Sequence, residues 1–468
     1  MSTVKVNKIE KRSGSTLTLG GPGTAVTLAC GATQTGFGRT GTVDWCTTAK
    51  TSPFTAVSGD GFFVNTSGGA ITVTLPSSPS AGDIVAFKDY AGTWATACKA
   101  VTLCRNGSKI GGECANATLN TVDQSVTLIY VDGTKGWQDI QDSTSSVSGK
   151  SYTSATGGTI TTSGDFKIHT FTADGCFAVS AVGNSAGGGD SVSYVVVAGG
   201  ASGGSDKTST TSSGGGGAGG YREGKVASGG GSDPYTASPL VAPAGVPLSV
   251  QTYPITVGAG GAAAPGPGGP TPGNDGANSV FSTITSAGGG GGSGVSPPAS
   301  KAEDGGSGGG AKQDNNGGSA NGVGIGNTPP VSPPQGNNGG QSDRSGPTYL
   351  AGGGGGAGAV GGSPATCGST TGPGGAGTAS SITGSPVLRA GGGGAGKSPP
   401  SYGSRNAGTA GPGGGGAGQP GPGTDPSALG TANTGGGGGG AFGGPNPSPS
   451  CGGTGGSGIV IIRYKFQN

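Results

Sequence analysis

Runs of consecutive glycine recur through the C-terminal half of the chain, and they restrict its fold more than any other feature. The longest are AGGGGGSG at 287–294, AGGGGGAG at 351–358, AGGGGAG at 390–396 and GGGGGGAFGG at 435–444. Most of them follow a short β-like segment, a repeat that a solvated linker does not need but an array of stacked units does. We therefore expect an ordered array. Disorder is the alternative, because 114 Gly and 32 Pro among 468 residues is a composition typical of low complexity.

Such runs favour packed polyglycine-II helices. A chain with three residues per turn and no Cβ atoms can place its backbone against other backbones on all sides. Collagen is excluded, because no stretch keeps glycine strictly at every third position. Ordering each residue costs roughly 1–2 kcal/mol of backbone entropy, so nearly every N–H and C=O group must be hydrogen-bonded. The glycines expected to be structural for this reason are Gly289, Gly290, Gly353, Gly354, Gly392, Gly393, Gly437 and Gly438.

Two β-prone segments flank the glycine-rich region. GIVIIRYKF at 458–466 is the most β-prone stretch of the chain, and VSYVVVAGG at 192–200 is its expected partner. Upstream, residues 166–182 predict a β-hairpin that turns at Asp174 and Gly175. The distal half is therefore expected to contain three parts: a hairpin with an opening strand at 151–198, a glycine-rich region at 199–458 and a closing strand at 459–468.

Residues 1–150 have an ordinary glycine content and predict an all-β module. Short strands are expected at 4–9, 15–20, 25–30, 62–65, 71–76, 83–90, 100–104 and 125–131. The expected fold class is an all-β N-terminal module plus packed polyglycine-II helices clasped by β-strands, with essentially no α-helix. The N-terminus has no apolar signal core, and no apolar run is as long as a membrane span. Neither a signal peptide nor membrane insertion is expected.

Charge and residue types argue against several classes of site. The net charge is +2 and 10% of residues are charged, whereas nucleic-acid binding requires clustered Lys and Arg. The eight cysteines include no C-x-x-C pair, and His169 is the only histidine, so scattered thiols are favoured over a metal site. We expect no cofactor, no metal and no nucleic acid.

The catalytic motifs in the sequence lack the structural context that their chemistry requires. GGGGAGKS at 391–398 matches the P-loop pattern, but Pro399 and Pro400 prevent the helix that must follow it. The distal acidic residues lie in Gly/Pro/Asn-rich loops and not on a rigid framework such as a glycosidase needs. A hydroxyl-nucleophile triad has only His169 to use as its base. We therefore expect no catalytic residues, and a protein that is not an enzyme.

The alternation of glycine runs and variable loops, over roughly 187–458, resembles the tip adhesins of T-even-like bacteriophages, in which polyglycine-II helices form a layered sandwich. Residues 45–94 are similar to segments of tail fibres from marine phages, notably cyanophages. VSYVVVAGG and GGTGGSGIVIIRYKF also resemble the opening and closing strands of the glycine-rich domains of those fibres. In the T-even-like case the adhesin is a separate chain, whereas here it continues from the β module.

The resemblance implies a viral tail-fibre or receptor-binding protein, located in the virion and made in the host cytoplasm. It also implies a homotrimer, contact with other phage tail proteins through the N-terminal module, and a bacterial surface receptor that is a glycan or an outer-membrane protein. Receptor contacts are expected in the loops between runs, because Tyr and Arg are frequent in binding hot spots and Asp suits glycan hydroxyls. The candidates are Lys301, Asp304, Asp343, Arg344, Tyr402 and Arg405, with solvated loop residues as the alternative interpretation.

A structural extracellular filament or sheath subunit, without receptor recognition, is the alternative function, and a capsule depolymerase is the third. An assembly protein should repeat its inter-run segments. Here VSPPASKAED, KQDNN and KSPPSYGSRNAG all differ. That variety of sequence favours a receptor-binding function over an assembly function.

Overall fold

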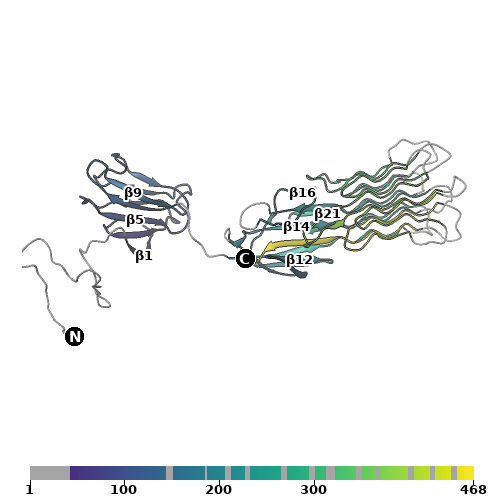
Figure 1. The fold of residues 1–468 in the computed structure, drawn as a ribbon, viewed down its shortest axis with the longest axis horizontal. Coiled ribbons are helices and arrows are strands. Elements are labelled where there is room, and N and C mark those ends of the chain that lie inside the picture. Colours follow the sequence, from purple (N-terminus) through teal and green to yellow (C-terminus); the bar gives the residue numbers. More distant parts are fainter. Residues whose placement is uncertain are drawn as a thin grey trace, which may run out of the picture. The chain divides into compact units, whose positions relative to one another are not determined.

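The computed structural model describes residues 43–143, 151–184, 187–205, 212–226, 232–264, 271–294, 301–312, 322–343, 350–364, 369–398, 405–421, 427–443 and 451–467. These ranges contain β-strands, turns and extended runs but no α-helix (Figure 1). The expected all-β fold class, with its glycine-rich domain, is confirmed. The chain divides into two compact units, Met1–Val147 and Ser148–Asn468.

The described part of the first unit has nine strands: β1 (Asp44–Lys50), β2 (Phe54–Thr55), β3 (Asp60–Val64), β4 (Ile71–Thr74), β5 (Ile84–Asp89), β6 (Val101–Cys104), β7 (Ala117–Leu119), β8 (Ser125–Tyr130) and β9 (Trp137–Ser143). The chain alternates between two sheets, ordered β1-β3-β5-β8-β9 and β2-β4-β6-β7. Strands β1, β3 and β5 are parallel, as are β2, β4 and β6. The unit is therefore a short parallel solenoid, and the antiparallel strands β7, β8 and β9 follow its last coil.

The core of the first unit lies between its two sheets. Phe62 and Phe87 from one sheet and Val73 and Leu103 from the other are at most 5% exposed, and Trp94 packs in the same cluster. Burial alternates along β4, β6 and β8, which places one face of these strands in this core. Five predicted strands are confirmed as β3, β4, β5, β6 and β8. The strands expected at 4–9, 15–20 and 25–30 lie outside the described residues.

The strands of the second unit are β10 (Ser154–Thr156), β11 (Thr159–Ser163), β12 (Phe166–Phe171), β13 (Gly175–Ala181), β14 (Ser191–Val197), β15 (Tyr221–Gly224), β16 (Val241–Ala242), β17 (Val246–Pro247), β18 (Thr252–Thr256), β19 (Ser279–Phe281), β20 (Ile284–Ser286), β21 (Thr378–Ser380), β22 (Val387–Arg389) and β23 (Ile459–Lys465). A seven-stranded sheet has the order β11-β12-β23-β14-β15-β16, with β17 paired to β14. A five-stranded sheet has the order β10-β13-β18-β19-β20, and β21 pairs with β22 alone.

The expected pairing of the opening and closing strands is confirmed. Strands β14 and β23 are antiparallel neighbours in the middle of the seven-stranded sheet (Figure 1), with Val195 opposite Ile461. Both side chains are fully buried. Because β14 precedes the first glycine run and β23 follows the last, this pair joins the two ends of the glycine-rich region.

The hairpin predicted over 166–182 is wrong. Strand β12 pairs with β11 and β23, whereas β13 pairs with β10 and β18 in the other sheet. The turn at Asp174 therefore carries the chain from one sheet to the other. Phe171 and Phe177, on the two arms, enter one apolar cluster between the sheets. Burial of both rings in that cluster favours the crossover over local pairing.

The glycine runs extend away from the sandwich and lie side by side (Figure 1). The run at 212–220 shows how they pack. Its successive amides 214–219 donate in turn to the runs 287–294, 350–358 and 435–443, and the cycle then repeats. A repeat of three residues in the direction of the amides is the geometry of a polyglycine-II helix.

The carbonyl groups of the same run complete the packing. They accept hydrogen bonds in rotation from three other runs, 198–205, 301–312 and 390–398. The central run thus has six neighbours, three that accept its amides and three that donate to its carbonyls. We refer to this array of runs as the glycine lattice. Its cohesion comes from backbone hydrogen bonds and not from apolar side chains.

Close backbone approach explains the choice of glycine. At all eight glycines expected to be structural, an added Cβ would lie 1.9–2.2 Å from a backbone carbonyl oxygen of another run. All eight are buried. Even one methyl group would therefore push two runs apart.

Candidate recognition face of the glycine lattice

The run ends that flank nine connecting segments lie at one end of the glycine lattice. Hydrogen bonds join residues that flank different connections: Ser205 Oγ to Thr271, Lys397 N to Gln419 and Ser427 Oγ to Cys451. The flanking run ends therefore lie together at one end of the lattice. We call this end the distal face; it consists of the run ends 205, 212, 264, 271, 294, 301, 312, 322, 343, 350, 364, 369, 398, 405, 421, 427, 443 and 451. The nine connecting segments themselves lie outside the described residues.

The runs turn back at the opposite end, beside the β-sandwich. Segment 327–335 is one such return, and its Gln335 carbonyl accepts from Tyr221 N in β15 at 2.8 Å. The hairpin β21–β22 is another, and Ser380 Oγ donates to the buried Glu223 carboxylate at 2.7 Å. The distal face is thus carried on a framework that is bonded along its length and anchored at its base. Such a framework leaves the connecting segments free to vary in sequence without repacking a core.

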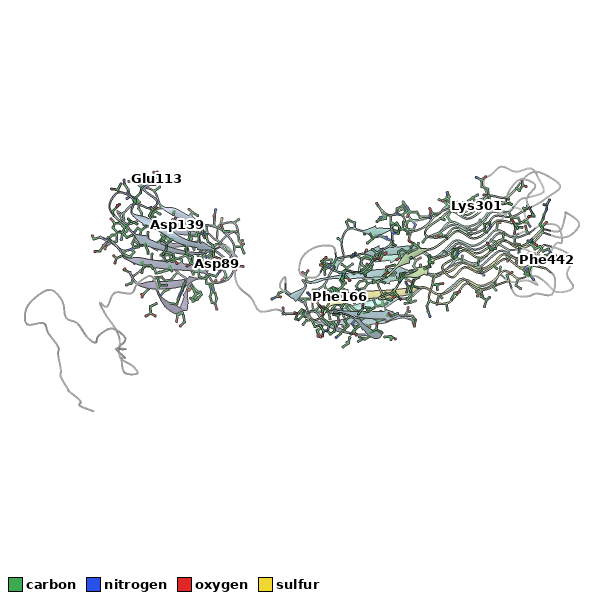
Figure 2. All side chains as sticks on the ribbon, in the orientation of Figure 1. Asp89, Glu113, Asp139, Phe166, Lys301 and Phe442 are labelled. Atoms are coloured by element: carbon green, nitrogen blue, oxygen red, sulfur yellow. The ribbon has the colours of Figure 1, made fainter. Side chains whose placement is uncertain are left out.

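Of the six predicted receptor contacts, Lys301 and Asp304 are brought together. The Lys301 ammonium lies 3.3 Å from the Asp304 carboxylate, with side chains 51% and 34% exposed. Asp304 Oδ1 also accepts from Ile325 N at 2.8 Å, so this carboxylate helps to hold an edge of the lattice. Figure 2 shows Lys301 at the outer surface of the runs.

The other four predicted contacts form two pairs, Asp343 with Arg344 and Tyr402 with Arg405, and the structure describes one residue of each. Asp343 is buried, and its amide donates to Leu350 O at 3.0 Å, which holds it inside a run end. Arg405 is half-buried at the start of the run 405–413. Arg344 and Tyr402 lie outside the described residues.

The sequence reasoning missed a group of side-chain acceptors along the lattice edge. Asn278 Oδ1 accepts from Gly288 N and Asp275 Oδ1 accepts from Gly291 N, both at 2.9 Å. These oxygens replace the carbonyl groups that a further run would have supplied. Burial raises the pKa of Asp275 above its ordinary range, while the Gly291 amide acts in the opposite direction. The signal was present as a three-residue spacing, Asp275 to Asn278, that matches the spacing of the two glycines.

Two surface grooves lie between run ends. The first, which we name the Lys397 groove, has a volume of about 450 Å³, and its lining includes Lys397, Asn406, Thr409, Ala417, Pro420 and Ala428. The second, the Asp275 groove, has a volume of about 410 Å³ and is lined by residues 271–275 and Glu303. The first lining contains a cation and no carboxylate, whereas the second contains two carboxylates. The two grooves therefore suit ligands of opposite charge.

The P-loop-like segment 391–398 binds no phosphate with its backbone in this fold. The amides of residues 391–397 all donate to carbonyl groups of neighbouring runs, at 2.9–3.1 Å. A phosphate-binding loop needs such amides free at the start of a helix. The rejection of the motif on sequence grounds agrees with this arrangement.

Arg463 and His169, two buried polar residues of the sandwich, are engaged within the fold. Arg463 Nε lies 2.8 Å from the Asp233 carboxylate, with side chains 3% and 1% exposed. Burial raises the pKa of Asp233, and Arg463 partly offsets that effect. His169 Nδ1 is 2.7 Å from Gly157 O and its Nε2 is 3.0 Å from Tyr464 Oη. Burial lowers the pKa of His169. A neutral imidazole donates to the carbonyl group and accepts from the tyrosine, so both ring nitrogens are used structurally.

Other classes of site find no support within the described ranges. No group of three His, Cys, Asp or Glu side chains gathers there as a metal site. The six cysteines of those ranges are free thiols. Among the same residues, no helix is long and apolar enough to span a bilayer.

Comparison with known proteins identifies the lattice as part of a wider family. No curated protein shows significant similarity to the chain. The family described as "Glycine-rich domain" matches residues 185–465, the range that holds β14, the glycine lattice and β23. Because this match covers more than half of the 468 residues, the chain belongs to the glycine-rich domain family.

Proposed function

We propose that the protein is a tail-fibre receptor-binding adhesin of a bacteriophage, located in the virion. It attaches the particle to a bacterial surface receptor, a glycan or an outer-membrane protein, without breaking bonds. Contact is made through the segments that join the glycine runs. The observation that carries the proposal is the gathering, at the distal face of one hydrogen-bonded lattice, of the run ends that flank nine such connections.

In this protein, stability and sequence variety belong to different parts of the chain. The lattice is held by backbone groups, which every residue supplies equally, so its stability does not depend on which side chains its connections carry. The connections are unlike one another: QDNNGGSAN at 313–321, RSGPTY at 344–349 and PPSYGS at 399–404. A rigid support that presents several dissimilar segments on one face suits recognition, and repeated copies of weak contacts add avidity.

In this proposal the first unit assembles the fibre, as a homotrimer that also contacts other tail proteins. Its solenoid exposes aromatic side chains that a solitary module would bury. Trp45 is 40% exposed and Tyr90 is 58% exposed, and Phe63 lies between them with ring centroids at 5.0 and 6.4 Å. Exposed apolar groups in contact with one another are typical of protein interaction surfaces.

The test replaces segments of the distal face and measures binding to cells. Segments 344–349 and 399–404 are exchanged, separately and together, for Ser/Gly linkers of equal length. The control exchanges 265–270, which contains only proline and glycine, for the same kind of linker. We expect labelled full-length protein to bind cells in a bacterial panel that includes marine cyanobacteria, and the double variant to lose that binding while unfolding as the parent does.

Two results oppose the proposal. Retention of cell binding by the double variant would remove these two segments as contacts. Absence of binding to every cell type, together with regular filaments of pure protein in electron micrographs, would favour the sheath or filament alternative.

A further inference from the structure

The Lys397 groove carries a feature that lattice formation does not explain. Lys397 is held at the distal face by its backbone: its amide donates to Gln419 O and its carbonyl accepts from Gly443 N, both at 3.0 Å. Its side chain is half-buried and lines the groove. Within the described residues, no hydrogen bond or ion pair engages its ammonium group. A cation that is partly desolvated and unpaired attracts an anion.

Two uncharged polar side chains lie beside this cation. Asn406 is fixed by its backbone, which donates to Ser369 O at 2.8 Å and accepts from Thr371 N at 3.0 Å. Asn406 and Thr409 line the groove, both residues are exposed, and neither side chain has a partner among the described residues. An amide and a hydroxyl each donate and accept hydrogen bonds, which matches the needs of sugar hydroxyl groups.

The remaining surface of the groove suits a ring. It is formed by Ala407, Gly408, Ala417, Gly418, Pro420 and Ala428. Small side chains leave a shallow and largely apolar floor, on which the C–H face of a sugar can lie. No lining residue is acidic. The Asp275 groove, with Asp275 and Glu303 in its lining, lacks this complementarity to an anion.

We propose that the Lys397 groove binds an acidic sugar residue of a bacterial surface glycan. Lys397 pairs with its carboxylate or phosphate, Asn406 and Thr409 bond its hydroxyl groups, and the ring lies against Pro420 and Ala417. The inference rests on the proposed attachment function, and it names a ligand class and a site on the lattice itself, separate from the connecting segments.

The test is isothermal titration of full-length protein with three probes. Trigalacturonate carries carboxylates, glucose 6-phosphate carries phosphate, and maltotriose is neutral. We expect at least one acidic probe to bind roughly tenfold or more tightly than maltotriose, because one charge-assisted hydrogen bond has about that effect. Binding of that probe should weaken as salt rises. The probe that binds identifies carboxylate or phosphate as the source of the charge.

Variants tie the binding to the groove. Lys397→Gln should weaken binding of the acidic probe by roughly ten- to a hundredfold, whereas the matched control Lys99→Gln, at a half-buried lysine of the first unit, should leave it unchanged. Asn406→Ala should weaken binding of the acidic probe while its preference over maltotriose persists. Thermal unfolding of each variant, compared with the parent, shows that the fold is retained.

Three results overturn the inference: equal binding of acidic and neutral probes, wild-type affinity in Lys397→Gln, or no binding of either acidic probe. Failure here is distinguishable from failure of the proposed attachment function. Protein that binds cells but neither acidic probe contradicts only the ligand assignment. Protein that binds an acidic probe but no cell contradicts attachment instead.

Discussion

Gly354→Ala tests the glycine lattice most directly. A Cβ added to Gly354 would lie 1.9 Å from the carbonyl oxygen of Gly216 and 2.4 Å from its carbonyl carbon. Ordinary contact begins at 3.4 Å, so the two backbones must separate by about 1.5 Å. Gly216 belongs to the central run, which has six neighbours. Neither backbone can therefore move without disturbing others.

The magnitude follows from the hydrogen bonds at this crossing. Gly354 N donates to Gly393 O at 2.8 Å, Gly393 N donates to Gly216 O at 2.9 Å, and Gly216 N donates to Gly438 O at 2.9 Å. A separation of that size takes at least two of them out of range. Each buried amide left unpaired costs roughly 1–3 kcal/mol. Alanine restricts the unfolded chain and offsets about 0.4–1 kcal/mol. We expect a net loss of about 1–6 kcal/mol in the stability of the second unit.

The assay can separate the two units. All three tryptophans, Trp45, Trp94 and Trp137, lie in the first unit, so tryptophan fluorescence reports its unfolding alone. Calorimetry then assigns the remaining transition to the second unit, and only that transition should move to lower temperature. The matched control is Gly421→Ala, because a Cβ there meets no atom of the described residues within 4 Å. Equal transitions for Gly354→Ala and Gly421→Ala would refute the packed-backbone account.

Other perturbations test the sandwich and the assembly. Arg463→Met leaves the Asp233 carboxylate buried without its cation, and calorimetry should show a loss of roughly 3–5 kcal/mol in the second unit; an unchanged transition would contradict this. Burial lowers the pKa of His169 below its ordinary 6.5, so the unfolded chain binds the proton first. The stabilisation that His169 contributes to the folded state is fully present above pH 6.5. It decreases as the pH falls below that value. Denaturant midpoints should show the decline in the parent and not in His169→Gln; equal acid sensitivity in both would count against it. Light scattering of the full chain should give a trimer mass, and a single-chain mass would exclude the proposed assembly.

The sequence alone determined which backbone architecture was possible. Glycine runs are compatible with close packing of backbones, and the carbonyl oxygens near Gly354 and Gly392 show why larger residues are absent there. The strong β-propensity of 192–200 and 458–466 likewise sufficed to pair the opening and closing strands. Both inferences succeeded because they depend on local residue types: the absence of a Cβ atom in one case, and β-branched side chains in the other.

Only the tertiary structure decided which segments meet. Every glycine run offers the same backbone amide donors and carbonyl acceptors. No sequence pattern could therefore reveal that Gly216 donates to Gly438, or that run 212–220 occupies the centre of the glycine lattice. Local propensity also could not show whether the two strands within 166–182 pair with each other. Burial of Phe171 and Phe177 between the sheets places β12 and β13 in different sheets. The distal face and the Lys397 groove arise from such long-range neighbours. Their geometry follows from how the whole lattice closes, and no single segment contains that information.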